Sequence, residues 1–386
     1  MSKSTDNNRG VGSVRLQVLG QEEVYKRKGH FTSRPSTIRR YKTPIVPSSL
    51  RRSKQLQIPM DFRSNPKYLG FDLIQATYKK VGSHEIETTI LVPQTPYTGK
   101  RPTIIRIHGG GLVMGDSLYP QFWPQWLSDL ALKHGAVIVS PNYRLLPEAT
   151  GLDIHDDLED FWTWLHTPEI HNILGNRTAP TDLDLDRILL AGDSAGGLLS
   201  VNFTLSHGAD IRAATAAYPC VSLDAPEFVN TRTVLPFGIN TSETFITDHL
   251  ASNRLDNPVS SDASPARTTL MFAGIQHGGL GPWYARGSEN SPRRGLIYPL
   301  ERLEQPGIQF PKGGLTITHG RQDSVVPVEQ SERFVARARE VTKGQPVSEK
   351  IVLVLQDGEH GFDSELRYEE TWLKDALRTA VEAWLE

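Results

Sequence analysis

Cysteine is nearly absent from this sequence: Cys220 is the only one among 386 residues, so no disulfide can form within the chain. Long apolar runs are missing as well. None reaches the roughly 18 residues of a membrane-spanning helix, and the first residues, MSKSTDNNRG, lack the apolar core of a secretory signal. An excess of one charge is also missing, because 42 basic and 44 acidic residues leave a net charge of −2. We therefore expect a soluble, cytoplasmic protein that binds no nucleic acid and does not insert stably into a membrane.

The charge that is present is unevenly distributed. Residues 1–60 contain 13 Lys or Arg and only 3 Asp or Glu, so the remaining chain has a net charge of −12. Neither interleaved aromatic residues nor a basic helical face is clear in this stretch, and both are typical of nucleic-acid or lipid binding. The sequence predicts a basic N-terminal arm over residues 1–65, partly disordered or part of a cap; a role in covering a binding site stays open.

From residue 70 onward, apolar strands alternate with helical patterns. Residues 71–81 and 84–94 read as a strand pair with a Gly-Ser turn between them. Further strands are predicted at 103–111, 136–144, 187–192, 213–221, 314–320 and 349–358, and helices at 122–135, 153–167, 196–206, 328–340 and about 365–385. This alternation predicts an α/β fold over residues 66–386, with a mostly parallel central sheet and helices on both faces.

Residues 222–312 lose this alternation and are rich in Gly, Pro, Ser and Asn. A structureless stretch of this length inside an α/β fold is most often an insertion over a binding site. We therefore predict a lid-like insertion at about 222–312.

One short motif carries chemistry at the end of a predicted strand. Gly192-Asp193-Ser194-Ala195-Gly196 fits the pattern G-x-S-x-G between a strand and a helix. Small neighbours allow a sharp turn that exposes the Ser194 hydroxyl, and the N-terminus of the following helix favours negative charge at the same place. Ser194 is thus a candidate nucleophile; a plain tight turn is the alternative.

Three further strand ends carry matching residues. His108-Gly109-Gly110-Gly111 can present backbone N–H groups that hold an oxyanion together with the N–H of Ala195, while His108 reads as an anchor of the loop. Asp323 follows the strand at 314–320, and His360 follows the last strand. Because parallel strands bring such loops to one edge of a sheet, Asp323 can orient His360, and His360 can take the proton of Ser194.

The motifs HGGG, PNYRLLPE, GDSAGG and EHGF, with the Asp after the next-to-last strand, resemble the hormone-sensitive-lipase-like family of α/β-hydrolases. The resemblance runs from about residue 70 to the end, with a gap across the insertion. It implies an α/β-hydrolase fold with Ser194, His360 and Asp323 as catalytic triad and Gly109, Gly110 and Ala195 as oxyanion-hole donors. It also implies that no metal and no cofactor is needed. Leu112, where the family often carries an aromatic residue, the long insertion and the basic arm depart from the family pattern.

The leading hypothesis is a serine hydrolase that cleaves a carboxylic ester or thioester of a small to medium apolar substrate, for example in secondary metabolism, through a covalent acyl-enzyme. An acyltransferase or cyclase with the same triad is one alternative, because only access of water to the acyl-enzyme separates it from a hydrolase. A ligand-binding protein on a hydrolase scaffold is another, although the retained His360 argues against it. Candidate lining residues of the substrate pocket are Leu112, Trp123, Trp126, Trp283 and Tyr284. The oligomeric state stays open.

Overall fold

The computed structural model describes residues 62–252, 255 and 257–386. Pro59–Glu386 form a compact unit of their own. The predicted basic arm at 1–65 lies almost wholly outside the described residues, so its boundary with the domain at 66–386 stays a prediction.

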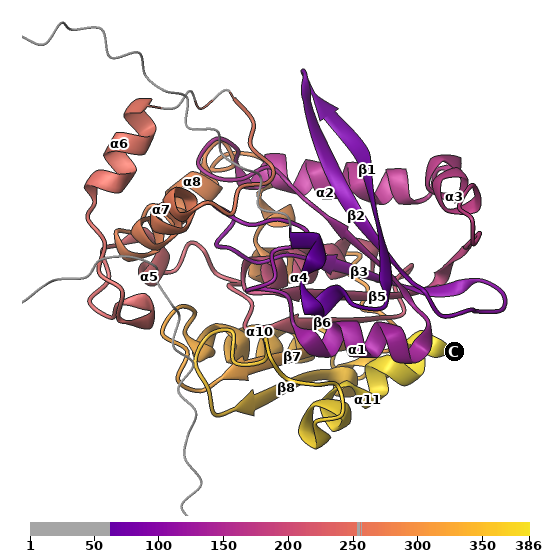
Figure 1. Ribbon diagram of the computed structural model, residues 1–386. Helices are drawn as coiled ribbons and strands as arrows, with labels where there is room; N and C mark the ends of the chain where they lie inside the picture. Colours follow the sequence, from indigo (N-terminus) through magenta and orange to yellow (C-terminus); the bar gives the residue numbers. More distant parts are fainter. Residues whose placement is uncertain (1–61, 253–254, 256) are drawn as a thin grey trace, which may run out of the picture. The chain divides into compact units, whose positions relative to one another are not determined.

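An eight-stranded sheet forms the centre of this unit (Figure 1). Its strands are β1 (Phe71–Val81), β2 (His84–Pro93), β3 (Arg101–Ile107), β4 (Val137–Pro141), β5 (Leu183–Asp193), β6 (Ala213–Ala217), β7 (Leu315–Gly320) and β8 (Ile351–Gln356). Their order across the sheet is β1-β2-β4-β3-β5-β6-β7-β8. The pairs β1–β2 and β2–β4 are antiparallel and all other neighbours are parallel, which confirms the predicted mostly parallel sheet.

The burial of the strands explains their sequences. All residues of β3, β4 and β6 are buried, as expected for central strands that are covered on both faces. The edge hairpin of β1 and β2 is more exposed and turns at Gly82, whose φ of 61° suits a residue without a side chain.

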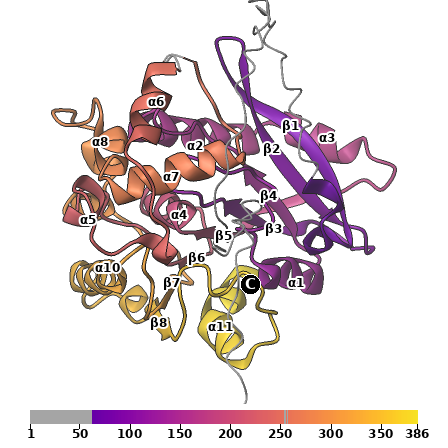
Figure 2. The same ribbon diagram turned by 60° about the vertical axis from the view of Figure 1, so that its left-hand side comes forward.

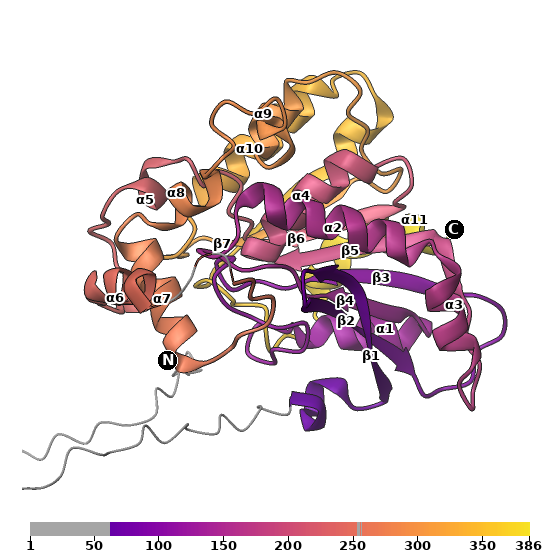
Figure 3. The same ribbon diagram turned by 90° about the horizontal axis from the view of Figure 1, so that it is seen from above.

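Helices cover both faces of the sheet, as Figure 3 shows for α2 and α4 on one side and α1 on the other. The longer helices are α1 (Gln125–His134), α2 (Gly151–Leu165), α3 (Pro168–Gly175), α4 (Ala195–His207), α6 (Thr244–Ser252), α7 (Pro265–Gln276), α10 (Val328–Val341) and α11 (Thr371–Leu385). The smaller apolar core contains side chains of α1 and α11, such as Leu127 and Trp384. The larger core contains side chains of α2, α4 and α10, such as Phe161, Leu198 and Phe334.

The segment 222–312 is helical, which corrects the expectation of a structureless stretch. Besides α6 and α7 it contains α5 (Pro226–Val229), α8 (Leu280–Ala285) and α9 (Pro299–Leu303). Helices α5 to α8 group together at the side toward which β7 and β8 point (Figures 1 and 2). Helical periodicity can be recognised only over roughly 11 to 18 residues, and several of these helices are shorter. The sequence pattern therefore does not predict them.

The described helices include none that combines the length and the apolar character needed to cross a membrane.

Candidate active site

Four loops at one edge of the sheet hold the predicted site residues. Ser194 follows β5, the glycine loop that begins at His108 follows β3, Asp323 lies beyond β7, and His360 lies beyond β8. In the sheet these four strands follow in the order β3, β5, β7 and β8, with β6 between β5 and β7, and all of them are parallel. Their carboxyl ends therefore meet at the same edge, where open α/β sheets place their reactive groups.

The turn at Ser194 is strained and depends on glycine. Ser194 has φ 55° and ψ −118°, a conformation that side-chain-bearing residues rarely adopt. A Cβ atom on Gly192 would lie 2.2 Å from the carbonyl oxygen of Gly196, and one on Gly196 would lie 2.2 Å from that of Ile107. Only glycine fits at either position, so the motif produces a tight strand-to-helix turn with the serine at its apex.

The structure brings Ser194, His360 and Asp323 together. The Nε2 atom of His360 is 2.9 Å from the Oγ atom of Ser194, and its Nδ1 atom is 2.7 Å from Oδ2 of Asp323. The side chain of Asp323 is fully buried and that of His360 is 12% exposed. These three groups thus form a continuous hydrogen-bonded chain, with the arrangement that a nucleophile, a base and an orienting carboxylate require.

Asp323 is held in its ionised form. Burial disfavours the charge, but the charge of His360, hydrogen bonds from His319 and His360, and a backbone hydrogen bond from Val326 together hold the pKa of Asp323 well below its usual value. Its Oδ1 atom accepts hydrogen bonds from the N–H groups of Val325 and Val326, both at 2.8 Å. The carboxylate is therefore a charged, fixed acceptor for His360.

The glycine loop lies against the serine. A Cβ atom on Gly109 would approach that of Ser194 to 3.4 Å. Gly110 has φ 109°, and a Cβ atom there would lie 2.1 Å from the carbonyl oxygen of Met114. Within the described residues, the backbone N–H groups of Gly109, Gly110 and Ala195 donate no hydrogen bond. Of these free donors, Gly109 lies against Ser194 and Ala195 follows it in the chain.

His108 anchors this loop. Its ring is fully buried, stacks on Tyr143 at 4.3 Å between ring centroids, and hydrogen-bonds the carbonyl oxygen of Gly109 through Nδ1. Burial, with a smaller effect of the Arg106 charge, lowers the pKa of His108 to about 4. The imidazole is therefore neutral at pH 7, as a structural side chain requires.

The five expected pocket residues are all buried in the protein core. Trp123 donates through Nε1 to Ser128, and Trp126 donates through Nε1 to Asp363. Both belong to the core on the α1 face of the sheet, and their role as pocket-lining residues stays a prediction. A helical pattern gives the buried side of α1 but not the sheet face on which the helix lies.

The remaining three belong to the larger core. Leu112 is fully buried with φ 61°, and Trp283 packs over Gly274 of α7. Tyr284 donates its hydroxyl to the carbonyl oxygen of Ile297. The role of these three residues in lining a substrate pocket stays a prediction.

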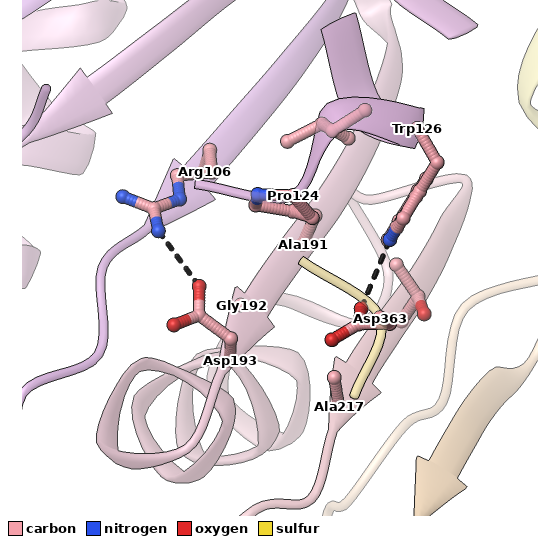
Figure 4. Close-up of a pocket in the computed structure, with 10 residues that line it drawn as sticks. Arg106, Pro124, Trp126, Ala191, Gly192, Asp193, Ala217 and Asp363 are labelled. Carbon is pink, nitrogen blue, oxygen red and sulfur yellow. Dashed lines mark hydrogen bonds and ion pairs between the residues drawn. The ribbon is translucent and has the colours of Figure 1, made fainter. Parts of the chain in front are cut away.

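Behind the serine turn, a cavity of about 10 Å³ is lined mostly by apolar residues, with Arg106, Asp193 and Asp363 as its charged side chains (Figure 4). Arg106 donates to Oδ1 of Asp193 at 2.8 Å on one side of it, and Trp126 donates to Asp363 on the other. Burial raises the pKa of Asp193 to about 6, with Arg106 opposing and Asp363 adding to the shift. This volume is at the lower limit for a cavity that holds one water molecule.

Three further side chains approach the site without having been expected there. The ring of Tyr218 lies 4.5 Å from that of His360, and its hydroxyl donates to Asp363. Phe237, in a 3₁₀ helix of the insertion, lies 6.3 Å from the His360 ring. A Cβ atom on Gly111 would meet Met271 of α7 at 2.8 Å. Phe237 and Met271 come from the segment without periodicity, so only the three-dimensional fold reveals them.

The described part of the chain contains no group of three or more His, Cys, Asp or Glu side chains that could hold a metal ion. Cys220 is buried, and burial raises the pKa of its thiol to about 12, so it is a core residue and not a thiolate.

Several known proteins resemble this chain in sequence. An α/β-hydrolase-fold family model matches residues 104–279. The chain is 30% identical to a probable carboxylesterase of Phoma sp., over 84% of this chain and the whole length of that protein. It is 48% identical to a probable carboxylesterase of Cochliobolus lunatus, over 21% of this chain and 39% of that one. A tuliposide A-converting enzyme of Tulipa gesneriana is 32% identical over 34% of this chain and 33% of its own.

Solved structures match the fold. A Staphylococcus aureus protein of unknown function superposes with a TM-score of 0.55 at 20% identity, covering 81% of this chain and 98% of that one. An esterase of Rhizomucor miehei superposes with a TM-score of 0.51 at 18% identity, covering 83% and 85%. With the full-length similarity to a carboxylesterase, these findings show that the chain has the α/β-hydrolase fold and belongs to the hormone-sensitive-lipase-like carboxylesterases, which are carboxylic-ester hydrolases.

Proposed function

We propose that Ser194, His360 and Asp323 are the catalytic triad of this carboxylic-ester hydrolase. Ser194 attacks the ester carbonyl carbon while His360 takes its proton through Nε2. The protonated His360 then gives the proton to the leaving alkoxide, and Asp323 stabilises the imidazolium. Water, activated by the same histidine, hydrolyses the acyl-enzyme and restores Ser194.

The observation that carries this proposal is the continuous hydrogen-bonded chain from Asp323 through His360 to Ser194, with distances of 2.7 and 2.9 Å. Each histidine nitrogen has the partner that its role requires. The serine lies at a strained turn, as expected of a nucleophile that must stay exposed.

The free N–H groups of Gly109, Gly110 and Ala195 are the proposed oxyanion hole. They are fixed before the substrate binds, so they stabilise the negative charge of the tetrahedral intermediate without rearranging. Loss of one such donor typically costs about 3 to 4 kcal/mol of transition-state stabilisation. The N-terminus of α4 adds a favourable dipole at the same place.

The substrate we propose is a small to medium apolar ester or thioester, such as an intermediate of secondary metabolism. Phe237 beside His360 and Met271 against the glycine loop are apolar groups of the segment 222–312, which we propose to act as a lid. One relative is named for its conversion of a single compound, tuliposide A, which supports a specialised substrate.

Turnover of p-nitrophenyl acetate, butyrate and octanoate tests the proposal, with the Ser194→Ala variant alongside. We expect the wild-type protein to release p-nitrophenol and the variant to lose on the order of 10⁶-fold in kcat. The matched control is Ser252→Ala at the C-terminal end of α6, which should keep wild-type turnover.

Equal turnover by wild type and Ser194→Ala would overturn the assignment of the nucleophile. Faster release from long-chain triglyceride emulsions than from short soluble esters would contradict the proposed substrate class while leaving the triad intact.

A further inference from the structure

His319 is a buried histidine beside the proposed triad. It lies in β7 and its side chain has no exposed surface. Its Nε2 atom is 3.2 Å from Oδ2 of Asp323 and 3.0 Å from the carbonyl oxygen of Val326. Its Nδ1 atom is 2.7 Å from the hydroxyl oxygen of Ser331 in α10.

These contacts define which nitrogen carries the hydrogen. A carboxylate oxygen and a carbonyl oxygen both accept and cannot donate, so the Nε2 atom of His319 must carry a hydrogen that the two oxygens share. The Ser331 hydroxyl can donate, and when it does the Nδ1 atom accepts and the ring stays neutral. Ser331 thereby selects the tautomer in which His319 donates to Asp323.

The oxygen that His319 reaches is the one that His360 uses. Oδ2 of Asp323 accepts from Nδ1 of His360 at 2.7 Å and from His319, while Oδ1 accepts from the backbone N–H groups of Val325 and Val326. Both oxygens are therefore fixed by donors other than His360. The carboxyl group cannot rotate without breaking one of these bonds.

We propose that His319 is a positioning residue of the catalytic machinery, which holds Oδ2 of Asp323 where His360 needs its acceptor. The proposal rests on the triad proposed above and extends it by one residue. A histidine that donates through Nε2 helps to fix the carboxylate in its ionised form. The strand that places Asp323 thus also supplies the side chain that orients it.

The test compares three variants by steady-state kinetics with p-nitrophenyl butyrate. His319→Leu removes the donor, His319→Gln can still offer an amide N–H to Asp323, and His207→Leu is the matched control. His207 makes the same kind of contact, 3.1 Å from a Glu159 carboxylate oxygen, but at the far end of α4 from Ser194.

We expect His319→Leu to lower kcat by about tenfold to a hundredfold, since a hydrogen bond to a charged group is lost. KM should stay within about twofold, because His319 is not placed against the substrate. His319→Gln should recover most of the loss, and His207→Leu should match wild type. The low-field proton resonance of His360 Nδ1–H should shift in His319→Leu only.

Equal kcat values for His319→Leu and His207→Leu, at equal thermal stability, would overturn the inference. So would a loss that appears in KM alone. If His319→Leu does not fold, Ser331→Ala replaces it, because it keeps the ring and removes only the donor to Nδ1. A loss of about twofold to tenfold in kcat is then expected, and wild-type kcat would overturn the inference.

Asp323→Asn separates this inference from the proposed triad. If Asp323→Asn keeps wild-type turnover, the triad itself is wrong. If it is inactive while His319→Leu behaves as His207→Leu does, the triad stands and only the role of His319 is lost.

Discussion

At the scale of single residues, the serine turn combines backbone strain with two glycines that nothing else can replace. The Cβ atom of Gly196→Ala would lie 2.2 Å from the Ile107 carbonyl oxygen and 2.5 Å from that of His108. Because backbone atoms cannot move aside, we expect this variant to lose both esterase activity and several kcal/mol of stability, about 3 or more. Urea denaturation and p-nitrophenyl butyrate turnover measure the two losses.

Gly175→Ala is the control for that substitution. Gly175 ends α3, and a Cβ atom there would meet no atom within 4 Å. Its stability should change by less than about 1 kcal/mol, with a gain expected because the unfolded chain loses freedom. A Gly196→Ala variant as stable as Gly175→Ala would contradict the steric argument.

Asp193, the residue before Ser194, should make the stability of the protein depend on pH. Burial raises the pKa of Asp193 from 3.8 to about 6, so the folded protein binds this proton more tightly than the unfolded chain does. The resulting stability is present below about pH 4 and is lost as the pH rises through about 6. A shift of this size corresponds to about 3 kcal/mol.

Between about pH 4 and pH 6 the unfolding free energy of the wild-type protein should fall by about 3 kcal/mol because Asp193 loses its proton. In Asp193→Asn we expect this part of the fall to be absent. The measurement is urea denaturation at a series of pH values. The exposed Asp210→Asn variant should keep the wild-type pH dependence. An unchanged pH dependence in Asp193→Asn would mean that the carboxyl group is already ionised throughout this range.

At the scale of elements, α7 is tied to the loop after β4 by a buried ion pair. Arg267 donates to both carboxylate oxygens of Glu148, at 2.8 and 3.0 Å, and to the carbonyl oxygen of Leu146. The two side chains are only 6% and 3% exposed. Removing Arg267 takes the guanidinium from the buried Glu148 carboxylate and leaves it the contact with His249 at 3.0 Å, and losing one partner of a buried ion pair is costlier than losing both.

Arg267→Met should accordingly lower the free energy of unfolding by about 3 to 5 kcal/mol, and adding Glu148→Leu should restore part of it. Thermal and urea denaturation of the single and double variants measure this difference. The half-exposed pair of Arg337 and Glu304 is the control, because solvent screens it and Arg337→Met should therefore destabilise far less than Arg267→Met. A double variant less stable than Arg267→Met would rule out the unpaired-charge explanation.

The predictability of each element from the sequence follows from its length and burial. The apolar runs of β5, β7 and β8 predict strands, and the polar residues Ser194, Asp323 and His360 follow them. Because parallel strands end at the same edge of a sheet, their positions predict that the three side chains lie together. His319 was not legible as a neighbour of Asp323, because a histidine inside a strand gives no sign of its face. Phe237 was not legible either, since it lies in a three-residue 3₁₀ helix without periodicity.

Trp126 shows a second limit. Its place on α1 was within the predicted helix, but helical periodicity cannot tell which face of the sheet the helix covers. Trp126 donates a hydrogen bond to Asp363, which lies 237 positions later in the chain, so this contact depends on the packing of the whole sheet.

At the scale of the whole molecule, the charge and the fold are divided at nearly the same position. Pro59–Glu386 form a compact unit by themselves, and the described hydrogen bonds of the proposed triad and oxyanion loop all lie inside it. Residues 1–58 contain 13 basic and 3 acidic side chains, so without them the net charge changes from −2 to −12.

We therefore expect a variant that begins at Pro59 to fold, to keep its thermal midpoint, and to hydrolyse p-nitrophenyl acetate with a kcat/KM within about twofold of the full chain. It should elute later from an anion exchanger, because its net negative charge is larger. As control, a variant that begins at His84 lacks β1, which pairs along nearly all of β2, and should fail to fold.

Slower turnover of acetate by the Pro59 variant would mean that residues 1–58 contribute to the site itself. A change confined to the octanoate ester would mean instead that they help to cover the binding site, because the serine, the histidine and the oxyanion donors serve both esters alike.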